Sequence, residues 1–292
     1  MPGSFILCFG ARRCILPSVA LSVVIITHNE EANLTLTLES LRGVLYDLRG
    51  EPARGEIIVV DSGSTDRTVE IAKSFGAKVF IEEWKGYAAQ KNSAIDKATG
   101  SWILSLDADE AVSPELLKEI SQAIVEQDSL GLSPDNPMFV DAFSMPRQNF
   151  FLRKPLRHGG FWPDRKVRLF HKDKGRFGVR LVHESVQVTG KVGKLHSPLL
   201  HHSYPTLSDY IEHMNRYSSL GAEMVVADAN GKVRFSFIDI ALRPLATFVY
   251  NYFLRLGFLD GREGLLLHLY HAVYVSWKYA KAWELSRQQR SD

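Results

Sequence analysis

The chain has 292 residues, of which 45% are hydrophobic and 23% are charged, and its formal net charge at pH 7 is +2. This composition excludes an intrinsically disordered protein, whereas the small net charge excludes no class of partner. Both cysteines, Cys8 and Cys14, precede the first predicted strand, so no disulfide framework is implied and a reducing compartment fits.

We expect residues 1–19 to form an N-terminal extension. Its short apolar piece is followed, not preceded, by Arg12 and Arg13, which is the reverse of a secretory signal. No uncharged apolar run reaches about 18 residues, so we predict no transmembrane helix. These features indicate a cytoplasmic protein.

Strands and helices are then expected to alternate. Leu21–Ile26 and Glu56–Val60 are apolar, β-branched runs of strand length, and each is followed by a polar turn and a helical pattern. Asn29 is a candidate cap for the first of these helices. A shorter strand is expected over 77–81 and a helix over 86–99. This alternation predicts an α/β fold with a parallel sheet and right-handed connections.

The next strand, Trp102–Leu106, ends in two carboxylates, Asp107 and Asp109. Close carboxylates repel each other and favour a cation, and hard oxygen ligands suit Mg²⁺ or Mn²⁺. The Asp-x-Asp pattern alone is weak, because about one match is expected by chance in a chain of this length. The alternative is a polar turn, with Ser113 and Pro114 beginning the following helix.

Polar residues follow the first, second and fourth of these strands, and parallel strands bring their carboxyl ends to one edge of the sheet. Three polar turns at one edge are better explained by a ligand than by capping. The sequence lacks a Gly-x-Gly-x-x-Gly motif after the first strand and lacks a P-loop motif, which argues against a dinucleotide cofactor and a P-loop nucleotide.

Four segments together resemble the nucleotide-diphosphosugar domain of glycosyltransferase family 2, which has the GT-A fold: Val23–Glu31, Val59–Asp66, Gly86–Asn92 and Trp102–Glu110. The resemblance implies a mostly parallel central sheet flanked by helices over residues 20–205, followed by a helical C-terminal region over 206–292. It further implies Mg²⁺ or Mn²⁺ on the donor diphosphate, held by Asp107 and Asp109. The donor-binding residues that it implies are Thr27, Asn29, Glu30, Asp61, Gly63, Gln90, Lys91, Asn92, Asp107, Ala108 and Arg168.

A narrower resemblance is to the lipopolysaccharide-core β-glucosyltransferase branch. It adds the motifs Arg168–Phe170, Val182–Glu184, His201–Tyr204 and Gly257–Gly261. It implies inverting transfer of a sugar from a UDP-hexose, with UDP-glucose favoured, to a lipopolysaccharide-core or other lipid-linked glycan, and no nucleic acid partner. The Gln-x-x-Arg-Trp motif of processive relatives is absent, which favours addition of a single sugar.

Beyond Glu126 we expect a turn-rich loop, a strand over Met138–Met145, and a basic stretch over 150–164. That stretch is suited to a mobile loop over the donor, although solvated surface explains its charge equally well. A strand over Lys166–His171 presents Arg168. His201 or His202 is a candidate to complete the metal shell beside Asp109, whereas a structural zinc is disfavoured because zinc-type cysteine spacing is absent.

Glu184 is the candidate general base, on a strand predicted over Val179–Val188. Its apolar neighbours would partly desolvate the carboxylate, which raises its pKa and makes it a better proton acceptor near neutral pH. His183 is the rival, and alternation along a strand points the two side chains in opposite directions. The alternative role of Glu184 is an ion pair with Arg168 or Arg180.

The C-terminal region begins with a predicted capping box from Thr206 to Asp209 and a helix to about Asp228. Residues 232–292 hold nine Lys or Arg and five Asp or Glu, and 12 of the 31 aromatic residues. Cationic and aromatic residues between Phe235 and Trp283 suit peripheral contact with an anionic membrane, at the inner face of the cytoplasmic membrane. A helical lid on the sheet or a dimer contact explains the same pattern.

Two alternatives to a glycosyltransferase remain from the sequence. Leu106–Glu110 resembles the nucleophile loop of haloacid-dehalogenase-type phosphatases, but Ala111 replaces their Thr or Val and two strand–helix units precede the loop. The other alternative is a catalytically silent protein that binds a sugar nucleotide.

Overall fold

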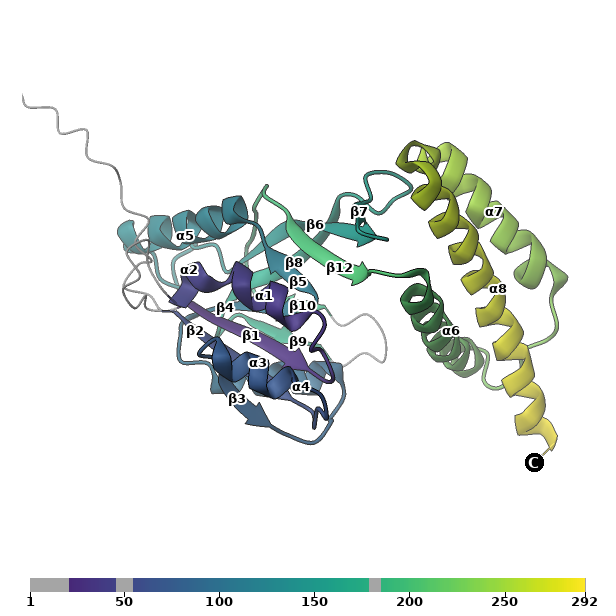
Figure 1. Ribbon diagram of the computed structural model, residues 1–292, viewed down its shortest axis with the longest axis horizontal. Coiled ribbons are helices and arrows are strands. Elements are labelled where there is room, and N and C mark those ends of the chain that lie inside the picture. The colour runs from purple at the N-terminus through teal and green to yellow at the C-terminus, as the bar shows by residue number, and fades with distance from the viewer. Residues whose placement is uncertain (1–20, 46–54, 179–184, 292) are drawn as a thin grey trace, which may run out of the picture.

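The structure is a computed structural model that describes residues 21–45, 55–178 and 185–291 (Figure 1). Its central sheet has a parallel half formed, in the order β3-β2-β1-β4, by β1 (Leu21–Thr27), β2 (Glu56–Asp61), β3 (Lys78–Ile81) and β4 (Trp102–Asp107). The four predicted strands are therefore confirmed. The strands β1, β2 and β4 are mostly apolar and almost entirely buried because both faces of the sheet are covered.

Helices cover both faces of this half. One core cluster joins the sheet to α1 (Leu34–Ser40), α3 (Thr68–Ser74) and α5 (Pro114–Ser129), and the other joins it to α4 (Tyr87–Lys97). The short α2 (Arg42–Leu45) follows α1. Alternation along the strands separates the clusters, since Ile57 and Val59 belong to the first and Ile58 and Val60 to the second.

Two predicted helix starts have different outcomes. Ser113 caps α5 by accepting a hydrogen bond of 3.2 Å from the Leu116 amide, with Pro114 in the first turn, as predicted. The prediction for Asn29 is wrong, because α1 begins after Asn33. Asn29 has a φ of +55° and instead accepts a hydrogen bond of 2.9 Å from the Thr65 amide, so it joins two turns.

Beyond β4 the sheet is mixed. Antiparallel β8 (Asp164–His171) pairs with β4, and β6 (Ala142–Phe151), β12 (Leu199–Tyr204) and β5 (Glu110–Val112) follow in that order. The short strands β7 (Lys154–Pro155) and β11 (Val192–Lys194) pair with β6. The strand predicted over 138–145 begins later, because the Phe139 amide donates to the Asn136 carbonyl in a turn and the Val140 amide donates to Gln127 Oε1 of α5.

A separate two-stranded sheet consists of β9 (Gly175–Phe177) and β10 (Val186–Val188). The strand β10 confirms the last part of the strand predicted over 179–188. Residues 179–184, which include His183 and Glu184, lie outside the described residues.

The C-terminal residues form a helical arm that projects from the sheet domain (Figure 1). It comprises α6 (Leu207–Asp228), η1 (Ile238–Leu242), α7 (Arg243–Val249), η2 (Tyr250–Leu254), η3 (Gly257–Asp260) and α8 (Gly261–Ser291), and α8 lies between α6 and α7. The capping box of Thr206 and Asp209 is confirmed by reciprocal hydrogen bonds. In the described residues no helix is both long and apolar enough to cross a membrane.

The basic stretch over 150–164 is hydrogen-bonded to the arm through Lys154, Arg157 and His158. The buried carboxylate of Asp260 accepts hydrogen bonds from the amides of Arg157 and His158 and from His158 Nδ1, the last at 2.8 Å. Lys154 Nζ donates to the Asp260 carbonyl and pairs with Glu263, both at 2.8 Å. Asp260 therefore joins the sheet domain to the arm.

We predict that Asp260→Ala lowers the free energy of unfolding by about 2–3 kcal/mol, because buried donors lose a charged acceptor. Trypsin cleavage after Arg157 should become faster. The control is Glu263→Ala, which removes the more exposed partner of Lys154 and should cost less than about 1 kcal/mol. Equal losses for the two variants in urea unfolding would contradict this role of Asp260.

Candidate active site

The polar ends of three strands meet at the carboxyl edge of the parallel half. Thr27 lies opposite Asp61 in the pairing of β1 with β2, and Ile26 lies opposite Asp107 in the pairing of β1 with β4. The edge of the sheet at which the sequence predicted a ligand site therefore carries these residues side by side. This is where open α/β sheets bind ligands.

Asp61 organises the turn after β2. Its buried carboxylate accepts hydrogen bonds from Thr27 Oγ1 at 2.8 Å and from the amides of Gly63 and Ser64 at 3.0 and 2.8 Å. Gly63 has a φ of +84°, a conformation that favours glycine. Because both carboxylate oxygens serve the turn, Asp61 and Thr27 shape the edge in this structure and do not present free polar groups.

Asn29 and Glu30 lie in the turn after β1. The Asn29 amide donates to Ser64 Oγ at 2.8 Å, which fixes this turn against the turn after β2. Burial raises the pKa of Glu30, a hydrogen bond from Asn33 opposes that rise, and the charges of Asp109, Asp66 and Asp107 add to it. Glu30 therefore belongs electrostatically to the same acidic edge.

The helix α4 brings Lys91 to this edge. Lys91 is buried and its Nζ lies 2.7 Å from Asp107 Oδ1, while the ring of Phe177 covers it at 5.1 Å. Gln90 is also buried, and its side-chain amide has no hydrogen-bond partner among the described residues. Asn92 differs, because its amide exchanges two hydrogen bonds of 3.0 Å with the Phe177 backbone and so holds β9 beside α4.

Arg168 is the centre of a buried ion network. Its Nη2 lies 2.5 Å from Asp107 Oδ2 and 2.6 Å from Glu110 Oε1, and Glu110 also accepts a hydrogen bond from the Asp107 amide at 3.0 Å. Burial alone would raise the pKa of Asp107, but the positive charges of Arg168 and Lys91 outweigh it and hold that pKa well below its usual range. Asp107 is therefore an anion with both oxygens paired.

The sequence assigned no role to three members of this network. Arg147 pairs with Asp164 at 2.7 Å and reaches Glu110 at 3.4 Å, so a second guanidinium supports the buried Glu110 carboxylate. The adjacency of Glu110 to the two aspartates was the one available signal. No sequence pattern pointed to Arg147 or Asp164, because they lie on β6 and β8, far along the chain from the two aspartates.

Asp109 has a different environment. Its Oδ2 lies 3.3 Å from His201 Nε2, and His201 Nδ1 lies 2.7 Å from Asn149 Oδ1. His202 instead stacks on Phe150, with ring centroids 4.5 Å apart. The intervening Ala108 is buried, and its carbonyl accepts a hydrogen bond from Thr37 Oγ1 at 2.7 Å. Both candidate histidines therefore adjoin Asp109, His202 through its backbone amide, which donates to the Asp109 carbonyl at 3.0 Å, and His201 through its imidazole, which contacts the carboxylate.

This pair fits a divalent cation better than Asp107 does. Among the described residues no group of three or more His, Cys, Asp or Glu side chains could hold a metal ion. A cation carried by a diphosphate needs only one or two protein ligands, because phosphate oxygens and water complete its shell. A carboxylate beside an imidazole whose other nitrogen is hydrogen-bonded is a suitable donor pair. Asp109 and His201 meet that description.

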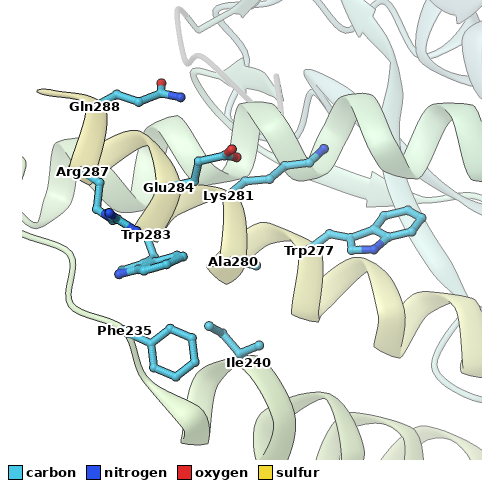
Figure 2. A pocket seen from close by; sticks show the side chains of 9 residues that line it. All are labelled: Phe235, Ile240, Trp277, Ala280, Lys281, Trp283, Glu284, Arg287 and Gln288. Carbon is cyan, nitrogen blue, oxygen red and sulfur yellow. The ribbon is translucent and has the colours of Figure 1, made fainter.

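The arm contains a cavity of its own, of about 870 Å³. Figure 2 shows Phe235 facing α8, where Trp277 and Trp283 line the cavity. Every lining residue comes from the arm, and none of the predicted donor-binding residues is among them. This cavity is therefore separate from the edge that carries Asp107 and Asp109.

Comparison with known proteins identifies relatives across nearly the whole chain. The family model described as glycosyl transferase family 2 matches residues 22–178. An uncharacterized glycosyltransferase of Rickettsia typhi is 30% identical over 93% of this chain and 89% of its own length. The lipopolysaccharide core biosynthesis glycosyltransferase LpsC of Rhizobium meliloti is 29% identical over 92% of this chain and 94% of its own.

Solved structures with partial likeness include one complex with a sugar nucleotide and one with a nucleotide. The mannosyltransferase PcManGT of Pyrobaculum calidifontis, in complex with GDP-Man and Mn²⁺, is 15% identical, covers 90% of this chain and 86% of its own, and has a TM-score of 0.48. TarS of S. aureus, in complex with UDP, is 16% identical, covers 93% and 91%, and has a TM-score of 0.42.

We predict that Arg168→Met lowers the free energy of unfolding by about 3–5 kcal/mol, because the fully buried Glu110 loses its closest counter-charge. The matched variant Lys91→Met should cost about 1–2 kcal/mol, since Asp107 is partly exposed and keeps Arg168. Urea unfolding of both variants measures the difference. A loss for Lys91→Met as large as that for Arg168→Met would place the structural centre of the network elsewhere.

Proposed function

Because the chain belongs to glycosyl transferase family 2, we propose that it moves one hexose, with inversion, from a nucleotide-diphosphate donor to a lipid-linked glycan. The chain is a glycosyltransferase and has the GT-A fold. UDP-glucose is the donor that the resemblance to the β-glucosyltransferase branch favours. The family relationship overturns the two alternatives, a phosphatase and a silent binder.

The observation that carries the proposal is the pairing of Lys91 and Arg168 with Asp107 at the carboxyl edge of the sheet. Two buried cations beside an acidic turn provide positive charge where a departing diphosphate develops negative charge. The phosphatase alternative requires Asp107 as a nucleophile, yet both of its oxygens are already paired with these cations. The arrangement therefore supports a leaving-group site.

In the proposed reaction an acceptor hydroxyl attacks the anomeric carbon from the face opposite the diphosphate. The new bond to the acceptor oxygen forms as the bond to the diphosphate oxygen breaks, and the hydroxyl proton passes to the general base. We assign the base to Glu184. In support, the described flanks of its segment meet at a hydrogen bond of 3.3 Å between Gly178 and Ser185, next to the Phe177 that covers Lys91.

A divalent cation is part of the proposal. Asp109 and His201 would hold it, because they are the adjacent carboxylate and imidazole at this edge. Bound Mg²⁺ or Mn²⁺ would supply additional charge neutralisation of the donor diphosphate. Lys91 and Arg168 orient Asp107 whether or not the cation is present.

The acceptor class follows from the relative with a named pathway, LpsC, which aligns over 92% of this chain. We propose a lipopolysaccharide-core or related lipid-linked acceptor. A lipid-linked acceptor lies at a membrane surface, so the proposal includes peripheral contact of this chain with the inner face of the cytoplasmic membrane.

For the cation, we predict that Asp109→Asn leaves folding intact and removes Mn²⁺-dependent donor binding, because one charged ligand of a hard cation is neutralised. A thermal-shift panel of nucleotide sugars, with and without Mn²⁺, measures this, since a ligand that binds the folded state raises the melting temperature. Asp135→Asn, in an exposed turn, is the control. Unchanged Mn²⁺-dependent stabilisation of Asp109→Asn by the donor would refute the assignment.

For the base, we predict that Glu184→Gln slows transfer by about 10²-fold or more while donor affinity stays near that of the wild type. Glutamine keeps the size of the side chain but cannot accept the proton as a carboxylate does. His183→Gln is the comparison variant, and its transfer rate should fall less. Normal transfer by Glu184→Gln, or a parallel loss of donor binding and activity, would move the base to another residue.

A further inference from the structure

The arm exposes an apolar face along η1, α7 and η2. More than half of the large hydrophobic side chains that are exposed in the described residues lie between 235 and 259. Their spacing is helical, and the stripe contains Ile238, Leu242, Leu245, Val249 and Phe253. Single exposed hydrophobic residues are common on protein surfaces, whereas a continuous exposed apolar stripe marks an interaction site.

The inner side of the same segment packs on α8. Pro244 is buried, Ser276 Oγ donates to the Ile240 carbonyl at 2.8 Å, and Arg243 donates to Tyr279 Oη at 3.1 Å. Figure 1 shows α7 on the side of α8 away from α6. The exposed stripe therefore faces away from the described part of its own chain.

The charge beside the apolar face is positive. Residues 232–262 contain five basic side chains and two acidic ones, Asp239 and Asp260. Both acidic side chains are already paired, Asp239 with Arg243 at 2.7 Å and Asp260 with His158 at 2.8 Å. Arg234 and Arg262 are exposed. The face thus combines apolar side chains with exposed cations.

We propose that this face docks on the anionic surface of a lipid bilayer, with η1, α7 and η2 lying in the plane of the headgroups. Amphipathic helices with cations beside their apolar side bind such surfaces by apolar burial and electrostatic attraction together. A second copy of the chain is a poorer occupant, because it would bring Arg234 and Arg262 close to the same cations of its partner. An anionic surface attracts them.

The cavity in the arm is continuous with this face through Phe235, which stacks edge-on against Trp283 at 5.3 Å (Figure 2). The hollow next to the stripe is lined by Trp277 and Trp283 and by polar side chains of the same helix, Lys281, Glu284, Arg287 and Gln288. Trp side chains suit the headgroup layer, where one end of the ring is apolar and the other meets water.

The docking face is also connected to the candidate active site. Asp260, at the end of the segment, holds residues 157 and 158 of the sheet domain by hydrogen bonds to the backbone. A bilayer bound at the face would therefore stand in a fixed relation to the carboxyl edge. The inference rests on the proposed function for the role of docking, which is to bring the enzyme to a lipid-linked acceptor.

The test is flotation of the full chain with vesicles of phosphatidylcholine alone and with about one-third phosphatidylglycerol. We expect binding to the anionic vesicles at low salt and weaker binding at high salt. The double variant Leu245→Glu/Phe253→Glu, whose wild-type residues are 59% and 52% exposed, should lose at least about tenfold in vesicle affinity. The control is Leu130→Glu/Met138→Glu, at residues 63% and 69% exposed in the sheet domain, and it should bind like the wild type.

Arg234→Glu/Arg262→Glu should weaken binding to anionic vesicles without changing the melting temperature. Light scattering coupled to size exclusion tests for a second copy. The proposal would be overturned if the wild type does not bind vesicles, or if Leu245→Glu/Phe253→Glu binds them as the wild type does. A dimer that this double variant converts to monomers would overturn it as well. Donor-induced thermal shifts are measured without lipid, so a failure of the proposed transferase function is distinguished from a failure of docking.

Discussion

The candidate site depends on the ion pairs that the buried guanidinium of Arg168 makes with Asp107 and Glu110. A charge removed from water must be paired, and breaking such a pair is strongly destabilising because the remaining charge is left uncompensated. Here one nitrogen of Arg168 contacts both Asp107, at the end of β4, and Glu110, at the start of β5. The turn that presents Asp109 is therefore fixed at both ends by one side chain from β8. The parallel and mixed halves of the sheet meet at this cation.

The parallel half could be predicted from the sequence because its signals are local. Continuous apolar runs such as those around Val24 and Ile58 are required when both faces of a strand are buried, and a parallel register then brings the strand ends together. The partners of the polar side chains could not be predicted, since they are distant in sequence. Arg168 and Asp107 are 61 residues apart, and Asn92 and Phe177 are 85 apart.

Two residues predicted to bind the donor also serve the scaffold. Asp61 and Asn92 have the chemistry of ligands, and in the fold that same chemistry satisfies backbone amides and carbonyls of neighbouring turns and strands. Composition and spacing cannot distinguish the two uses, because both need an oxygen or amide at the same place. In the arm, the helical period was visible in the sequence and the Gly257–Gly261 motif contained Asp260, but the partner of Asp260, His158, lies 102 residues away and could not be predicted.

The arm also contributes to the surroundings of the acidic edge, which ties its position to the chemistry there. His213 and Tyr217 of α6 stack with ring centroids 4.1 Å apart, and Tyr204 of β12 meets His213 edge-on at 5.2 Å. Burial lowers the pKa of His213 to about 4, while the negative charge of Asp109 acts in the opposite direction. The helix that follows the last strand therefore lies within electrostatic reach of Asp109. Because α8 packs along both α6 and α7, a continuous series of packed helices joins the exposed apolar face to the residues around Asp109.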